Sequence, residues 1–208
     1  RLGVKSSFIP ENKNQSIESL FTSSYEISTP SKNLVAYIED KIGDKELTSV
    51  VKSANKDILS EYLWGKDILD LLTIDPNYQF NIDDILSNLK SLQHRAYSIS
   101  SSPKKYPDSI HMTISAVRWN NNDRTHLGVC SSYLSDRVIE SKSVKMFVSP
   151  NKSFRVPEDG QTPMIMVGPG TGIAPFRAFL DEREMSKAKG ENWLFFGDQT
   201  RQFDFAYE

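Results

Sequence analysis

The sequence predicts a multidomain α+β protein, because its hydrophobic pattern changes twice along the chain. Through residues 1–92 apolar residues recur at helical spacing, as in the stripe that begins at Ile82. Through residues 93–160 apolar and polar residues alternate, as they do in antiparallel strands. Through residues 161–208 continuous apolar runs flank a glycine-rich turn, which is typical of a parallel sheet. We therefore expect three successive parts with these boundaries.

The first part is expected to be an all-helical subdomain. Asn81 can cap a helix that starts at Ile82. An apolar stripe from Leu34 to Ile42 predicts another helix, which Gly43 would end. Short polar breaks separate these segments from further apolar faces between residues 58 and 72.

The second part is expected to be antiparallel sheet. Alternation predicts strands over residues 95–101, 110–116 and 144–148. The polar run 119–123 predicts a turn.

The third part reads as one βαβ unit. The apolar runs Met164–Val167 and Trp193–Phe196 predict two strands buried on both faces, with a helix that begins near Pro175 between them. A lone βαβ unit has too few strands to bury both faces of its sheet, so the sequence looks truncated.

Composition excludes several classes of function. The 208 residues carry a net charge of −2 with acids and bases interspersed, so nothing argues for nucleic acid. The apolar runs are too short to cross a bilayer, and the amino terminus has no signal-peptide pattern. Cys130 is the only cysteine and the histidines lack ligand spacing, so we expect no metal site and no internal disulfide. We expect a cytoplasmic protein that does not bind membranes.

The strongest single motif is the glycine-rich stretch Gly168–Pro175, between a predicted strand and a predicted helix. Glycines let the backbone approach a ligand closely, and the amides of a helix start suit a pyrophosphate. No Gly-Lys-Ser/Thr closes the loop, so it is not a Walker loop, and the third glycine is displaced from the usual dinucleotide fingerprint. The alternative is a tight strand–helix turn without a ligand.

Two weaker motifs lie in the second part. On a strand at Arg95–Ser98, arginine could pair with phosphate and tyrosine could stack on a flat ring. At Gly128–Ser131, helix-start amides and a serine hydroxyl could hold a second phosphate. From pattern alone, a half-exposed strand and an ordinary serine N-cap are the better explanations.

Taken together, the ordered motifs resemble the diflavin reductases of the ferredoxin–NADP reductase superfamily. The stretches that carry the likeness are Arg95–Pro103, Gly128–Ser131, Gly168–Leu180 and Trp193–Gly197, with Tyr25–Pro30 further upstream. Within this family, Gly168–Phe179, Asn192–Gly197 and Phe154–Pro157 are most similar to the flavoprotein (alpha) subunits of NADPH-sulfite reductases. The resemblance implies a partial antiparallel FAD-binding β-barrel with an all-helical connecting insertion, followed by the start of an α/β NADP-binding domain.

The resemblance also implies roles for individual residues. Arg95 would pair with an FAD phosphate, Tyr97 would stack on the isoalloxazine, and Ser98 would assist hydride transfer at flavin N5. The other cofactor-binding positions carried over are Ala96, Thr113, Ile114, Ser115, Trp119, Gly128, Val129, Cys130, Ser131 and, more weakly, Ser28 for FAD, and Gly168, Gly170, Thr171 and Gly172 for NADPH. The sequence departs from the family at His94, commonly proline, and at Cys130, commonly a smaller alanine or a threonine.

The implied activity of the whole protein is an oxidoreductase reaction. Hydride would pass from NADPH to FAD, and electrons would pass through FMN, held in an N-terminal domain outside this chain, to a haemoprotein (beta) subunit that reduces sulfite to sulfide. Asp198 after the second buried strand would on general grounds suggest NAD, but the family reads the 2′-phosphate further along its chain. Two alternatives stay open: a diflavin reductase with a cytochrome-type acceptor, and a non-catalytic fragment. The chain alone is expected to be inactive.

Overall fold

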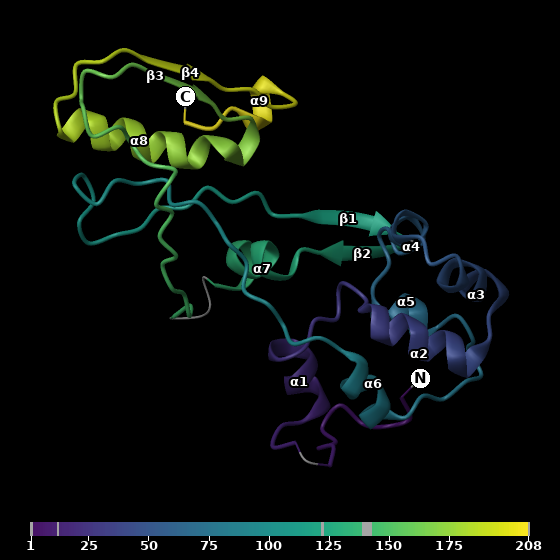
Figure 1. Ribbon diagram of the computed structural model, residues 1–208. Helices are drawn as coiled ribbons and strands as arrows, with labels where there is room; N and C mark the ends of the chain where they lie inside the picture. The colour runs from purple at the N-terminus through teal and green to yellow at the C-terminus, as the bar shows by residue number, and fades with distance from the viewer. Residues whose placement is uncertain (1, 12, 122, 139–142, 208) are drawn as a thin grey trace. The chain divides into compact units, whose positions relative to one another are not determined.

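A computed structural model describes residues 2–11, 13–121, 123–138 and 143–207 (Figure 1). By its internal contacts the chain divides into two compact units. The first consists of residues 1–94 and 120–125, and the second of residues 95–119 and 126–208. Within the described part of the chain, every helix is too short or too polar to cross a bilayer.

The first unit is built of short helices, each started by a polar cap. The helices are α1 (Ile17–Ser23), α2 (Lys32–Ile42), α3 (Lys45–Lys52), α4 (Lys56–Tyr62), α5 (Ile68–Leu72) and α6 (Ile82–Asn88). The side chains that accept the first backbone amides belong to Ser16, Ser31, Asp44, Asn55, Asp67 and Asn81. Gly43 ends α2 with a φ of 59°, a left-handed conformation that glycine adopts without strain. The predicted helices at 34–42 and from 82 are therefore confirmed.

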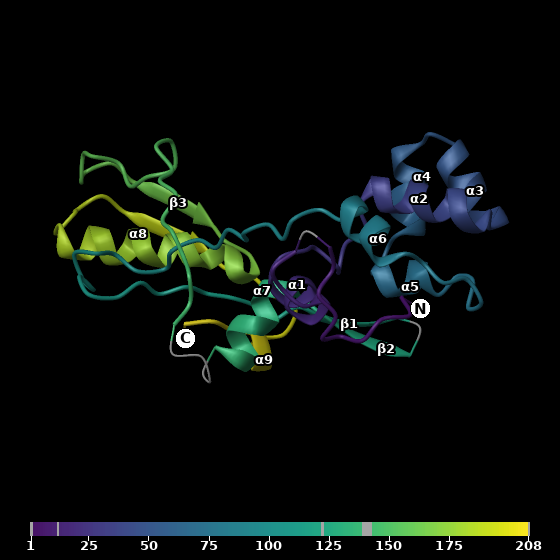
Figure 2. The same ribbon diagram turned by 90° about the horizontal axis from the view of Figure 1, so that it is seen from below.

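The core of the first unit lies around α2. Helix α2 packs against α3, α5 and α6, and α3 and α4 lie beside it in Figure 2. The fully buried side chains of this core are Leu34, Ile38, Leu47, Leu71 and Ile85, with Phe80 2% exposed. The stripe from Ile82 to Leu89 is buried as its spacing requires.

A hairpin and a short helical stretch follow in the second half of the chain. Strand β1 (Arg118–Asn121) pairs with β2 (Arg124–Leu127). The predicted turn at 119–123 is too early, because the strand continues to Asn121 and Asp123 turns the chain with a φ of 58°. Helix α7 (Val129–Ser132) continues directly into the π-helical turn η1 (Tyr133–Arg137).

The strands predicted at 95–101, 110–116 and 144–148 do not form continuous strands in the described residues. One antiparallel bridge joins Ile99 to Met112, and the Ser100 amide donates to the His111 carbonyl at 2.8 Å. The next backbone groups bond to side chains, since the His111 amide donates to Ser101 Oγ at 3.0 Å. Side chains thus occupy backbone groups that would otherwise form the hydrogen bonds of a β-ladder. The predicted barrel is accordingly not closed in the part of the chain that the structure describes.

The predicted βαβ unit is confirmed in its order. It consists of β3 (Met164–Val167), the 3₁₀ turn η2 (Gly170–Ile173), α8 (Ala174–Met185) and β4 (Asn192–Phe195), followed by α9 (Arg201–Asp204). Strands β3 and β4 are parallel, with Met164 opposite Asn192 and Val167 opposite Phe195.

Burial on both faces of this sheet was predicted wrongly. Helix α8 covers one face, where Met166 is 1% exposed (Figure 1). On the other face Ile165 is 75% exposed and Trp193 is 62% exposed. Both side chains lie on one face because they are register partners, and no described element covers them.

Candidate functional site

The segment Arg95–Ser98 lies at the start of the second unit, outside any helix or strand. Arg95, Ala96 and Ser98 are exposed, whereas Tyr97 is half-buried. Burial and, next, the interaction with the nearby Cys130 raise the pKa of Tyr97 to about 12, against the opposing charge of Arg95. The structure therefore places the first predicted FAD motif near the second, 33 positions along the chain.

The turn at Gly128 shapes the second motif. Its amide donates to the Val117 carbonyl at 2.8 Å, and the Val117 amide donates to Ser131 Oγ at 3.1 Å. A Cβ on Gly128 would lie 2.5 Å from Ser131 Oγ, so the approach requires glycine. Val129, Cys130 and Ser131 are the first three residues of α7, and the amides of a first helical turn have no partner within the helix.

The residues predicted to line the cofactor lie between these motifs. Ile114 is half-buried and Ser115 is exposed. The Thr113 hydroxyl shares a hydrogen bond with the Tyr207 hydroxyl. Trp119 stacks on buried His126, with ring centroids 5.1 Å apart and an interplanar angle of 15°. One face of the Trp119 ring is therefore occupied by protein.

The glycines in the loop after β3 differ in the structural reason for each. A Cβ on Gly168 would lie 2.8 Å from the Gly172 carbonyl oxygen and 2.8 Å from the Phe176 ring. Gly170 has a φ of +54°, a left-handed conformation. The amides of these glycines bond within the protein, to the carbonyls of Phe195 (from Gly168), Gly197 (from Gly170) and Pro169 (from Gly172), each at 2.9 Å.

These bonds revise how the loop would hold an anion. The glycine amides are committed to the shape of the loop, the Ala174 amide donates to the Thr171 carbonyl, and Pro175 has no N–H. In this stretch the donor for a phosphate would therefore come from Thr171. Thr171 is exposed, and no side chain caps α8. The carboxylate of Asp198 borders the loop, because Oδ2 would lie 3.5 Å from a Cβ on Gly170.

Ser28 belongs to the first unit. Its hydroxyl donates to Glu26 Oε1 at 2.6 Å and its amide to the same oxygen at 3.1 Å. This serine is thus committed to a local turn around a buried glutamate.

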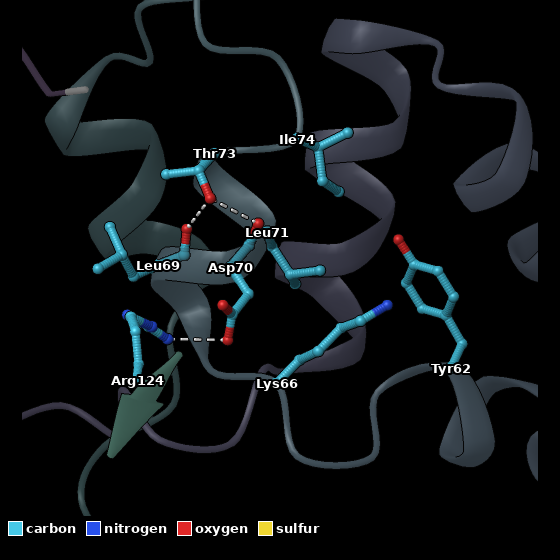
Figure 3. Close-up of a pocket in the computed structure, with 8 residues that line it drawn as sticks. All are labelled: Tyr62, Lys66, Leu69, Asp70, Leu71, Thr73, Ile74 and Arg124. Carbon is cyan, nitrogen blue, oxygen red and sulfur yellow. Dashed lines mark hydrogen bonds and ion pairs between the residues drawn. The ribbon is translucent and has the colours of Figure 1, made fainter. Parts of the chain in front are cut away.

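The first unit also contains a pocket of about 340 Å³, shown in Figure 3. Lys66 Nζ lies 3.4 Å from the centre of the Tyr62 ring, and Arg124 donates to Asp70 at 2.9 Å. None of the predicted cofactor-binding residues lines this pocket.

Sequence reasoning missed a polar cluster in the second unit. Arg177 on α8 donates to the Ser100 carbonyl, and its Nη1 lies 3.3 Å from His111 Nδ1. Lys105 pairs with Asp181 at 2.9 Å and with Glu184 at 2.8 Å. One sequence signal was available: Arg177 is a cation in the opening turns of a helix, where the helix dipole disfavours positive charge.

The site residues fit a flavin nucleotide and a nicotinamide nucleotide in their chemistry. The second unit offers an aromatic side chain and an arginine at Arg95–Tyr97, together with two helix starts entered through constrained glycines, Gly128 before α7 and Gly168 before α8. Helix starts favour phosphate, and an aromatic face favours a flat ring.

Comparisons with known proteins agree with this chemistry. Residues 5–133 match the family described as FAD binding domain, and residues 166–208 match the family described as oxidoreductase NAD-binding domain. Similar curated relatives are each named "Sulfite reductase [NADPH] flavoprotein alpha-component". One from Vibrio parahaemolyticus is 41% identical over 95% of this chain, and one from Bacillus subtilis is 39% identical over 89% of it. The chain spans 31% of the length of each of these two relatives.

Proposed function

The chain belongs to the FAD-binding domain family, and we propose that it forms the FAD- and NADPH-binding part of an NADPH-dependent sulfite reductase flavoprotein. The observation that carries the proposal is the pair of family matches, of residues 5–133 to the FAD binding domain and of residues 166–208 to the oxidoreductase NAD-binding domain. The names of the relatives support the same assignment.

We assign the FAD site to the second unit. Arg95 pairs with a phosphate of FAD, Tyr97 presents its ring to the isoalloxazine, and Ser98 is the catalytic residue beside N5. The positions that complete the site are Ala96, Thr113, Ile114, Ser115, Trp119, Gly128, Val129, Cys130 and Ser131. The family resemblance alone adds Ser28 to the cofactor-binding positions. Bound FAD supplies hydride acceptance and one-electron release, which no protein side chain supplies.

We assign the NADPH pyrophosphate to the loop after β3. Thr171 donates to it, while the close packing of Gly168 and the left-handed φ of Gly170 set the path of the backbone, and the exposed Gly172 lets the ligand approach the backbone. The division into parts 1–92, 93–160 and 161–208 follows the same assignment.

For the whole protein we propose sulfite reduction in the cytoplasm, with FMN as a further cofactor and a haemoprotein subunit as the electron acceptor. A diflavin reductase that serves a cytochrome would share every residue assigned above. The two are therefore distinguished by the acceptor and not by this chain.

The test uses the full product of the gene. Its visible absorption spectrum is recorded, and the released cofactors are identified by chromatography and quantified. Stoichiometric FAD that NADPH reduces under anaerobic conditions is the expected result. A protein that neither carries nor takes up FAD would refute the proposal. Sulfite with its haemoprotein, compared with cytochrome acceptors, then identifies the acceptor.

A further inference from the structure

One face of helix α8 holds the segment that follows the predicted flavin motif. Arg177, Asp181 and Glu184 are spaced four and three residues apart, so they lie on the same side of the helix. Glu182 lies next to this face, where it accepts a hydrogen bond from the Ser102 hydroxyl and pairs with Lys104 at 2.7 Å. Lys105 pairs with both Asp181 and Glu184. The segment 100–105 runs along α8 in Figure 1.

Arg177 is the member of this face that contacts the segment nearest to Ser98. Its Nη1 donates to the Ser100 carbonyl, while the Ser100 amide donates to the His111 carbonyl at 2.8 Å. Both backbone groups of Ser100 are therefore held, two positions after Ser98.

Aromatic rings and a second acceptor fix the guanidinium of Arg177. The guanidinium carbon lies 4.8 Å from the centre of the Tyr207 ring and 5.9 Å from that of Tyr106. Nη1 lies 3.3 Å from His111 Nδ1, and an arginine can only donate, so this imidazole nitrogen is the acceptor. Asp181 Oδ2 is 3.9 Å away. A planar guanidinium that has partners on several sides is held rigidly, and so are the groups that it contacts.

The position of Arg177 along the chain indicates what its contacts with Ser100 and His111 connect. Arg177 is the fourth residue of α8, and α8 follows the loop that is assigned to the NADPH pyrophosphate. A cation near a helix start gains nothing from the helix dipole, so its contacts with Ser100 and His111 are what favour it there.

We propose that Arg177 is a positioning residue for hydride transfer, which fixes the nucleotide loop at Gly168–Gly172 against the segment that carries Ser98. The inference rests on the proposed function. Without Arg177 both cofactor sites would still form, but the nicotinamide and the flavin would lose their fixed approach. A misplacement of about 1 Å at a reacting centre can cost on the order of 100-fold in rate.

The test compares Arg177→Gln and Arg177→Lys with wild type in the full product of the gene. Lys189→Gln is the matched control, because it removes one positive charge from an exposed position beyond α8. FAD content, the Kd of NADP⁺ and the anaerobic rate of flavin reduction by NADPH are measured. The rate is also measured with NADPH deuterated at the transferred position.

We expect Arg177→Gln to keep its FAD and to bind NADP⁺ within about twofold of wild type, while flavin reduction slows by roughly 10- to 100-fold. The deuterium isotope effect should be as large as in wild type or larger, because the transfer itself is slowed. Arg177→Lys should recover only part of the rate, since an ammonium cannot reproduce the planar fork. Lys189→Gln should behave as wild type.

Three results would overturn the inference. A loss of NADP⁺ affinity that accounts for the whole loss of rate would make Arg177 a phosphate ligand. An isotope effect that falls toward unity would place the slow step outside hydride transfer, and an unchanged rate would remove Arg177 from the reaction. If Arg177→Gln does not fold, Arg177→Lys is judged by the same criteria. A wild-type protein that NADPH does not reduce would instead defeat the proposed function.

Discussion

Replacing Gly168 by alanine tests whether the loop after β3 is shaped by close packing. The added Cβ would lie 2.8 Å from the Gly172 carbonyl oxygen and 2.8 Å from the Phe176 ring, where ordinary contact begins at 3.4 Å. The carbonyl belongs to the backbone, so the loop itself must move. Overpacking of this kind costs about 1–3 kcal/mol.

The expected result is a lower Tm and weaker nucleotide binding. Each kcal/mol corresponds to about 2–4 °C in a domain of 150–250 residues. Moving the loop should also weaken NADP⁺ binding by at least about tenfold, which is roughly 1.4 kcal/mol. Thermal unfolding followed by circular dichroism gives the first value, and titration calorimetry with NADP⁺ gives the second.

Gly172→Ala is the control within the same loop. Among the described residues its Cβ would meet only Pro169 Cδ, at 3.6 Å, and Gly172 does not have a positive φ. Its Tm should therefore stay close to that of wild type. If Gly168→Ala melts with wild type and binds NADP⁺ normally, the packing explanation of this glycine is wrong. If Gly172→Ala loses NADP⁺ without losing Tm, a ligand approaches the backbone at that residue.

Three further outcomes follow from the proposed site and its surroundings. Ser98→Ala should keep FAD but slow its reduction by NADPH; an unchanged stopped-flow rate would exclude Ser98 from the reaction. Tyr97→Ala should lose FAD, while Tyr97→Phe, which keeps the ring and loses only the hydroxyl, should retain it; equal flavin content in both would contradict stacking. Burial raises the pKa of Glu182, but Lys104 and Ser102 outweigh it and hold the pKa below the usual range. The stabilising effect of the Glu182 carboxylate is therefore complete above about pH 4.5 and is lost as the pH falls through the lowered pKa. The free energy of unfolding in urea should consequently fall less steeply at acid pH in Glu182→Gln than in wild type. An identical fall in both proteins would count against this ion pair.

The helical part was predictable because its determinants are local. Caps such as Asn81, the stripe over Ile82–Leu89 and the left-handed Gly43 each act within one or two turns. The shortness of the helices was harder to predict, since side-chain caps start several of them only a few residues apart. Ser53 ends α3, and Asn55 already caps α4.

The antiparallel part was less predictable because its pairing is not local. Alternation from Ile110 to Ala116 indicates a strand, of which the structure has one isolated bridge at Met112, and alternation does not say what the backbone groups bond to. The Ser100 carbonyl accepts from Arg177, 77 positions away, and the His111 amide donates to Ser101 Oγ. No periodicity in the sequence encodes either bond. The exposed face at Ile165 and Trp193 was missed for a related reason, since an apolar run indicates a capacity for burial and not the element that provides it.

The candidate site shows the same division between local and distant determinants. The glycines after β3 could be found from sequence because a strand–loop–helix connection needs them at fixed positions. Their role in the structure differs from the expected one, because their amides bond to the carbonyls of Phe195, Pro169 and Gly197. The glycine spacing therefore indicates the shape of the loop and does not by itself indicate a ligand. A cofactor assignment for this loop therefore depends on the motifs that accompany it. The position of Tyr97 near Cys130 adds to that support, because it brings two of those motifs together from separate parts of the chain.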